Sequence, residues 1–248
     1  MSAETPRMRM FAGPNGSGKS VLKSYLPDAL LGVYLNPDEI EARIRRDGRL
    51  VFQDFGVEVT EAEALGHFTG SAFLRAENLE QDARQLRPID GGLDFTAVEV
   101  NAYFASVAAE FLRRKLLERK VTFTFETVMS HPGKVALLKT AQEAGYRTYL
   151  YYVATEDPAI NVSRVANRVA LGGHAVPEDK IVERYGRSLE LLPQAIGRTN
   201  RAYIFDNSTD NADGRHTWVA EITEGKTLEL KADRIPAWFK RAVLDKLT

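Results

Sequence analysis

The segment GPNGSGKS at residues 13–20 constrains the fold most, because it matches the P-loop pattern G-x-x-x-x-G-K-[ST] in full. Its glycines let the backbone curl so that successive N–H groups point at phosphate oxygens. Lys19 adds a positive charge for the β and γ phosphates, and the Ser20 hydroxyl is a ligand for Mg²⁺. The segment therefore predicts a nucleotide-phosphate site formed by Gly13, Pro14, Asn15, Gly16, Ser17, Gly18, Lys19 and Ser20.

Strand-forming and helix-forming runs alternate around and beyond this motif. The apolar run at residues 8–12 leads into the motif, and residues 21–26 continue it as a short helix. A P-loop requires this strand–loop–helix context. The alternation predicts an α/β fold of the P-loop NTPase type, with a parallel sheet and helices on both faces. Further strands are expected at residues 32–36, 121–127, 147–154 and 202–205, and helices at 133–143, at 158–171 and from Pro177 onward.

One domain is expected to span all 248 residues, because no convincing linker interrupts the pattern. A helical insert is expected over about residues 58–120, in two pieces that are broken near residues 87–92. Residues from about 164 to 187 have the form of a lid. The C-terminal part, from about 215 to 248, is expected to form a β-hairpin followed by a helix.

Composition excludes several classes of function. The chain has no cysteine, so it has neither disulfides nor thiolate metal sites. Its net charge of −1 and its pI near 6.5 argue against a nucleic-acid or anionic-lipid partner. The N-terminus lacks the apolar core of a signal peptide, and no apolar run is long enough to span a bilayer. A soluble cytoplasmic protein without a membrane partner is therefore expected.

Two carboxylates are expected at the carboxyl edge of the sheet, where α/β folds bind ligands. Asp38 follows the strand at residues 32–36 and could accept the proton of an attacking hydroxyl; alternatively, it caps the helix that begins at Glu39. Glu126 lies near the end of the strand at residues 121–127. It could contact a substrate hydroxyl or a magnesium-bound water, or it could be an ordinary strand-end residue that faces solvent.

His131 precedes a predicted helix, in the run Ser130-His-Pro-Gly. We expect Ser130 to cap this helix. His131 is a candidate substrate contact, with a purely structural role as the alternative.

Basic residues recur in the lid segment. Arg164 and Arg168 stand four residues apart, on one face of a predicted helix. Gly172 and Gly173 form a flexible connection to a second helix that carries Arg184. Closure of such a lid would bring arginines onto a transferring phosphoryl group. The alternative is a solvated pair of charged helices, because Glu178, Asp179 and Glu183 lie there too.

Taken in order, these motifs resemble the zeta-toxin family of P-loop kinases. The resemblance covers roughly residues 8–208 and rests on the P-loop, on the Asn36-Pro37-Asp38 run, on Glu126-Thr127 and on the arginine-rich lid. Members of this family phosphorylate a sugar hydroxyl of UDP-N-acetylglucosamine and act as the toxins of toxin–antitoxin pairs.

The resemblance implies phosphoryl transfer from ATP with Mg²⁺, to a small-molecule hydroxyl acceptor, and an antitoxin as protein partner. It implies Asp38 as general base, with Lys19 and the lid arginines Arg164, Arg168 and Arg184 stabilising charge. Glu126, Thr127 and His131, together with Asp38, are the implied substrate contacts.

The chain departs from the family at two places. His174 stands near the position where family members carry a lid arginine, so Arg184 is expected to substitute for it. Residues 58–120 cannot be matched to the sugar-nucleotide pocket. A kinase of a nucleoside, nucleotide or polynucleotide therefore stays open, as does an ATP-binding regulatory module that phosphorylates nothing. A regulatory module has no need of a carboxylate such as Asp38 facing an acceptor hydroxyl.

Overall fold

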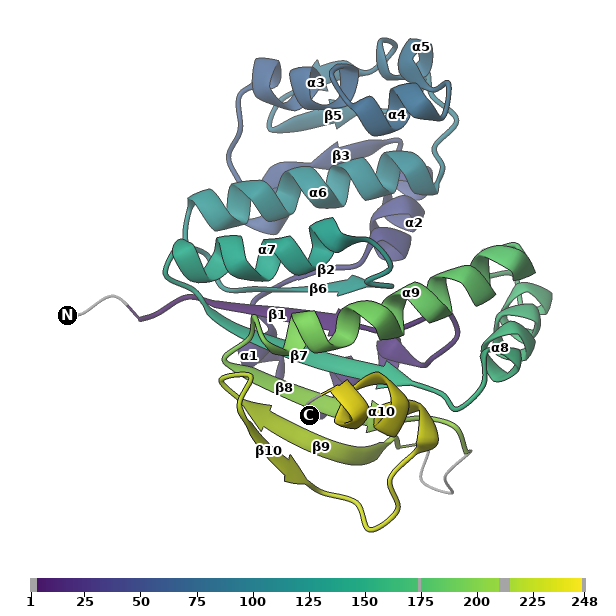
Figure 1. Cartoon of the computed structure of the whole chain (residues 1–248). Coiled ribbons are helices and arrows are strands. Elements are labelled where there is room, and N and C mark those ends of the chain that lie inside the picture. Colours follow the sequence, from purple (N-terminus) through teal and green to yellow (C-terminus); the bar gives the residue numbers. More distant parts are fainter. Residues whose placement is uncertain (1–3, 174, 210–214, 247–248) are drawn as a thin grey trace. The chain divides into compact units, whose positions relative to one another are not determined.

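The computed structural model describes residues 4–173, 175–209 and 215–246 (Figure 1). The chain divides into two compact units. Unit 1 contains the residues up to Leu31 and those from Thr124 onward, and unit 2 contains Gly32–Phe123. Unit 2 is therefore wider than the insert expected at residues 58–120. The assignment of the whole chain to a single kinase domain stays a prediction.

Unit 1 is built on a mostly parallel sheet whose strands follow the order β10-β9-β8-β7-β1-β6. The pairs β1/β7 and β7/β8 are parallel, whereas β8/β9 and β9/β10 are antiparallel. This arrangement confirms the predicted α/β fold class and the C-terminal hairpin. The strands are β1 (Arg7–Ala12), β6 (Phe123–Thr127), β7 (Arg147–Ala154), β8 (Arg201–Asp206), β9 (Thr217–Thr223) and β10 (Thr227–Leu230).

The helices α7, α9 and α10 pack on one face of this sheet (Figure 1). Tyr152 points toward them from β7: its hydroxyl is 3.0 Å from the Ser188 hydroxyl of α9. Trp238 of α10 donates its indole N–H to Asp206 Oδ1 over 2.7 Å. Both rings are fully buried, and burial of a large apolar side chain stabilises the folded protein by about 1.5–3 kcal/mol. The polar atoms of both rings are hydrogen-bonded. The helices of unit 1 are η1 (Lys19–Tyr25), α1 (Asp28–Leu31), α7 (Pro132–Glu143), α8 (Pro158–Ala170), α9 (Glu178–Ile196), α10 (Ala237–Ala242) and η3 (Leu244–Lys246).

Unit 2 is mainly helical but contains a small antiparallel sheet of order β3-β5-β4. The break expected near residues 87–92, between two helical pieces, is a hairpin. Gly91, at φ +65°, forms the two-residue connection with Asp90, as is common in hairpins. The elements of unit 2 are β2 (Val33–Leu35), α2 (Pro37–Asp47), β3 (Arg49–Val51), η2 (Phe52–Phe55), α3 (Glu61–Thr69), α4 (Ala72–Ala76), α5 (Glu80–Ala83), β4 (Arg87–Ile89), β5 (Gly92–Asp94) and α6 (Ala102–Glu118).

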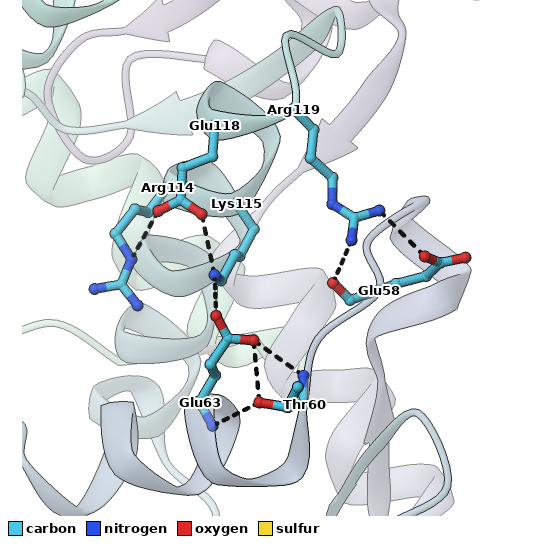
Figure 2. Close-up of polar contacts among 7 residues, drawn as sticks. All are labelled: Glu58, Thr60, Glu63, Arg114, Lys115, Glu118 and Arg119. Carbon is cyan, nitrogen blue, oxygen red and sulfur yellow. Dashed lines mark hydrogen bonds and ion pairs between the residues drawn. The ribbon is translucent and has the colours of Figure 1, made fainter.

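Polar contacts fix the start of α3 on α6 within unit 2 (Figure 2). Thr60 and Glu63 form a capping box, in which each side chain accepts a hydrogen bond from the other residue's backbone N–H. Lys115 of α6 donates to Glu63 Oε1 over 2.7 Å. This bond and those from Thr60 lower the pKa of Glu63 to about 2. The cluster therefore has a structural role in the insert.

In the part of the chain that the structure describes, no helix is long and apolar enough to cross a membrane. The same residues include no group of three or more histidine, aspartate or glutamate side chains that could hold a metal ion.

Candidate nucleotide-binding site

The P-loop connects β1 to the 3-10 helix η1 in unit 1. Gly13 has φ +144°, and a Cβ atom there would lie 2.0 Å from the carbonyl oxygen of Val153. Gly18 has φ +93°, and a Cβ atom there would lie 2.5 Å from Asn207 Nδ2. Glycine is therefore required at both positions, because a Cβ atom would clash with a close neighbour and because other residues rarely adopt this backbone conformation. The short helix expected after the motif is present as a seven-residue 3-10 helix.

Lys19 folds back onto the loop that precedes it. Its ammonium group donates hydrogen bonds of 2.8 Å to the carbonyl oxygens of both Gly13 and Pro14. The positive charge is thereby held at the loop, where the P-loop pattern expects it to meet phosphate oxygens.

Two asparagines outside the motif hold the loop from the side. Asn161, fully buried in the first turn of α8, donates to the carbonyl oxygen of Asn15 over 2.5 Å. Asn207, directly after β8, donates to the carbonyl oxygen of Ser17 over 2.9 Å. Neither residue was predicted from the sequence. Asn207 directly follows a predicted strand, and that position was the available signal for it, whereas Asn161 lies within a helix and had none.

His216 lies buried next to the same loop, with 8% of its surface exposed. Its backbone N–H donates to the Tyr25 hydroxyl over 2.7 Å, and its ring contacts the rings of Tyr25 and Phe205. Burial, reinforced by the charge of Arg164, lowers the pKa of His216 to about 4. The imidazole is therefore neutral near pH 7. His216 was not predicted from the sequence to lie in the site.

Several buried polar atoms around the loop have no hydrogen-bond partner among the described residues. They include the Ser17 hydroxyl and both ring nitrogens of His216. His216 Nε2 lies 2.9 Å from the position that a Cβ atom on Gly18 would occupy. Unpaired polar atoms and curled glycines fit a loop that binds an anion. A pocket beside the loop is lined by Ser24, Tyr25, Arg215 and His216.

The three candidate arginines of the lid differ in their surroundings. Arg164 of α8 is half-buried and donates to the carbonyl oxygen of Asn207 over 2.8 Å, so it supports a residue that holds the P-loop. Arg168 is exposed on the same helix, and Arg184 is half-buried on α9. His174 lies outside the described residues. Catalytic roles for the arginines, and closure of α8 and α9 as a lid, stay predictions.

Asp38 is exposed at the second position of α2, in unit 2. The cap of this helix is Asn36, whose side chain accepts from the Asp38 backbone N–H over 2.9 Å. The alternative role of Asp38 as helix cap is therefore wrong. Its function as a general base stays a prediction.

The residues that follow β6 were also candidates. His131 is the cap of α7: its Nδ1 accepts from the Gly133 backbone N–H over 3.1 Å. The expectation that Ser130 is the cap was wrong, and His131 has a structural role. Glu126 and Thr127 are half-buried at the end of β6, the neighbour of β1 in the strand order, and the Thr127 hydroxyl accepts from the Met129 N–H. Substrate contact by Glu126, Thr127 or His131 stays a prediction.

A model of the zeta toxin family matches residues 82–213, which is more than half of the chain. The chain belongs to the zeta toxin family. This membership confirms the resemblance and makes the chain a P-loop kinase of the zeta toxin type. The match begins after the P-loop, so the assignment of residues 13–20 as a P-loop depends on their motif and geometry.

A Haemophilus influenzae protein described only as uncharacterized is 26% identical over 176 residues, which cover 71% of this chain and 89% of the relative. Among solved structures, a chain of the AvrRxo1-ORF1:ORF2 complex is similar, with a TM-score of 0.51 and 13% identity. The similarity covers 96% of this zeta toxin family chain and 64% of the AvrRxo1 chain. A chain of the Streptococcus pneumoniae PezAT system has a TM-score of 0.49 and 14% identity, with 88% of this chain and 72% of that one covered. At 13% identity, the likeness to the AvrRxo1 chain shows the fold alone.

Proposed function

We propose that this protein transfers the γ-phosphoryl group of Mg–ATP to a hydroxyl of a small molecule, and that the acceptor is a sugar nucleotide such as UDP-N-acetylglucosamine. The observation that carries the proposal is the P-loop at residues 13–20, with Lys19 folded onto it and two asparagines holding it from outside. Membership of the zeta toxin family supports the choice of acceptor.

In this mechanism the backbone N–H groups of the loop and Lys19 bind the β and γ phosphates. The Ser20 hydroxyl would hold Mg²⁺, which would supply positive charge to offset the negative charge of the phosphates. Asp38 accepts the proton of the acceptor hydroxyl as its oxygen bonds to the γ phosphorus, and ADP leaves with the β–γ bridging oxygen. Arg168 and Arg184 stabilise charge on the transferring group.

Replacing Asp38 tests the mechanism. Because Asn36 caps α2, Asp38→Asn is expected to leave the fold intact. Phosphorylation of the acceptor should fall by about 10²–10⁴-fold, the usual contribution of a general base, while ATP affinity holds. The measurements are ATP titration and product formation with UDP-N-acetylglucosamine.

Glu39→Gln is the matched control, because Glu39 is the next residue of the same helix turn and is also exposed. Unchanged product formation in Asp38→Asn would remove Asp38 from the mechanism. Tight ATP binding by the wild type without phosphorylation of any tested sugar nucleotide, nucleoside, nucleotide or polynucleotide would favour a regulatory module.

We further propose that the protein is the toxin of a toxin–antitoxin pair in the cytoplasm, with an antitoxin protein as its partner. The family assignment supports this role. The AvrRxo1-ORF1 structure, which has the same fold, was solved in complex with a second protein, AvrRxo1-ORF2.

A further inference from the structure

The face of the unit 1 sheet opposite α7, α9 and α10 carries a row of arginines and tyrosines. Tyr151 lies on it, because its neighbour Tyr152 points toward α9 and successive strand residues face opposite ways. Residues opposite each other on paired strands share a face, so the pairing registers give the other residues of this face. Besides Phe11, Phe205 and Thr223, it carries the residues that we call the arginine–tyrosine face: Arg7, Arg9, Arg147, Tyr149, Tyr151, Arg201, Tyr203, Trp218 and Glu221.

The aromatic rings of this face pack on one another and on arginines. Tyr151 and Tyr203 stack with ring centroids 4.7 Å apart, and Tyr203 contacts Trp218 at 6.3 Å. The guanidinium groups of Arg9 and Arg147 lie 5.2 and 5.8 Å from the centroid of the Tyr149 ring. Broad sides of several rings are therefore covered within the protein itself.

Positive charge exceeds negative charge on this face. Two of its arginines are paired: Arg201 with Glu221 at 2.9 Å, and Arg7 with Glu4 at 2.9 Å. Arg9 is only 4% exposed, and its Nη1 has no hydrogen-bond partner in the described part of the chain. Burial lowers the pKa of Arg9, because a buried cation is costly. An anion bound at this face would offset part of that cost.

We propose that the arginine–tyrosine face is a docking surface for an acidic segment of a partner protein. Arg147 is exposed, the Arg201 side chain is 41% exposed, and Trp218 is 40% exposed at the far end of the row. Guanidinium groups bind carboxylates through paired hydrogen bonds. The Lys231 ammonium group lies 5.0 Å from the centroid of the Trp218 ring, and the exposed part of the indole offers an apolar contact. The chemistry therefore fits glutamate and aspartate side chains next to an apolar one.

A single-stranded nucleic acid fits this face less well. Proteins that bind single strands stack successive bases on exposed aromatic rings along a positively charged groove. Here Tyr151 and Tyr203 cover each other, and the net charge of the whole chain is −1. The observations thus favour a short acidic peptide over a long polyanion.

The test uses the full-length protein and a fluorescein-labelled peptide of glutamates with one central leucine, followed by fluorescence anisotropy. We expect the wild type to bind this peptide, with affinity that falls as salt rises. Arg147→Glu should weaken binding about tenfold or more, because a charge-assisted contact is replaced by repulsion. ATP affinity of this variant should equal that of the wild type, which separates the proposal from the kinase function.

Arg46→Glu is the control, since Arg46 is an exposed arginine of unit 2, which contributes no residue to this face. A lysine-rich peptide of equal length and a single-stranded oligothymidylate are the comparison probes. Absence of glutamate-peptide binding by the wild type, or equal binding by Arg147→Glu and Arg46→Glu, would overturn the proposal. Preferential binding of oligothymidylate that Arg147→Glu abolishes would overturn it in favour of nucleic acid.

Discussion

At the scale of single residues, the P-loop depends on side chains that the motif does not contain. Asn161 and Asn207 donate to its carbonyl oxygens, so they fix the backbone without competing for the N–H groups that face phosphates. Asn161 is fixed in turn by the Thr155 hydroxyl. The loop is thus preorganised by a layer of amide and hydroxyl groups behind it.

Arg164 and Arg168 should behave differently when each is replaced by alanine. Arg164 donates to the carbonyl oxygen of Asn207, so Arg164→Ala should loosen the P-loop and lower ATP affinity about tenfold as well as turnover. Arg168→Ala should lower turnover alone, as expected for a charge stabiliser used in the transition state. Calorimetric ATP titration and single-turnover assays measure the two effects. Wild-type ATP affinity in Arg164→Ala would contradict the supporting role.

His216 should make stability depend on pH. Its pKa is about 4 in the folded protein, against an ordinary value near 6.5, so the unfolded chain binds more protons between these values. The stabilisation from the neutral imidazole is present above about pH 6.5 and is lost as the pH falls toward about 4. His216→Phe keeps a ring against Tyr25 and should make the free energy of unfolding depend less on pH between about 4 and 6.5. Urea unfolding across this range measures it, and equal pH slopes in both proteins would contradict the assignment.

At the scale of helices and strands, three helices begin with the same pair, a capping residue followed by proline. Asn36, His131 and Asp157 each accept a backbone N–H two residues ahead, and proline follows each of them. Proline is favoured at the first helical position because its missing N–H would be unpaired there. In these three helices the residue before the proline is the cap, and the predictions that Asp38 and Ser130 are caps overlooked this. In α9 and α10 the proline itself, Pro177 or Pro236, is at the cap position.

The cap of α2 gives a stability prediction. Asn36→Ala should lower the free energy of unfolding by about 1 kcal/mol, whereas Asn36→Asp should be nearly neutral, since aspartate is an equally good cap. Asp38→Ala is expected to cost less than Asn36→Ala. Urea denaturation of the three variants makes the comparison. A larger loss in Asp38→Ala would mean that Asp38 is the more important residue for this helix.

Long elements could be predicted from the sequence and short ones could not. The strand at residues 147–154 was predicted with the bounds of β7, because six of its eight residues are apolar or aromatic and give a clear signal. The strands β4 and β5 have three residues each, too few to show alternation, so their glycines were interpreted only as a break between helices.

At the scale of the whole molecule, the P-loop of the candidate site could be predicted from the sequence, whereas the two asparagines that support it could not. The P-loop is one contiguous pattern. Asn161 and Asn207, in contrast, are 146 and 190 residues away from the loop residues they bind, and only folding brings them there. Such pairs leave no local spacing to recognise.

The proposed toxin role gives a prediction for the living cell. Induction of the wild-type protein in a bacterium should stop growth, and Lys19→Ala should not, because the charge that grips the phosphates is lost. Colony counts after induction measure the effect, and immunoblots check that both proteins accumulate equally. Normal growth with abundant wild-type protein and no antitoxin present would count against the toxin role while leaving the kinase role untouched.

The distant supports of the P-loop also set an order of events during translation. Residues 13–20 leave the ribosome before the side chains that hold them, Asn161 and Asn207, are synthesised. His216, which lies next to Gly18, follows later still. A nascent chain that stops before residue 207 has the phosphate-binding motif without the Asn207 side chain that supports it. The ribosome must therefore add the 190 residues from Ser17 to Asn207 before the loop is fully held, and products truncated before residue 207 are expected to bind nucleotide poorly.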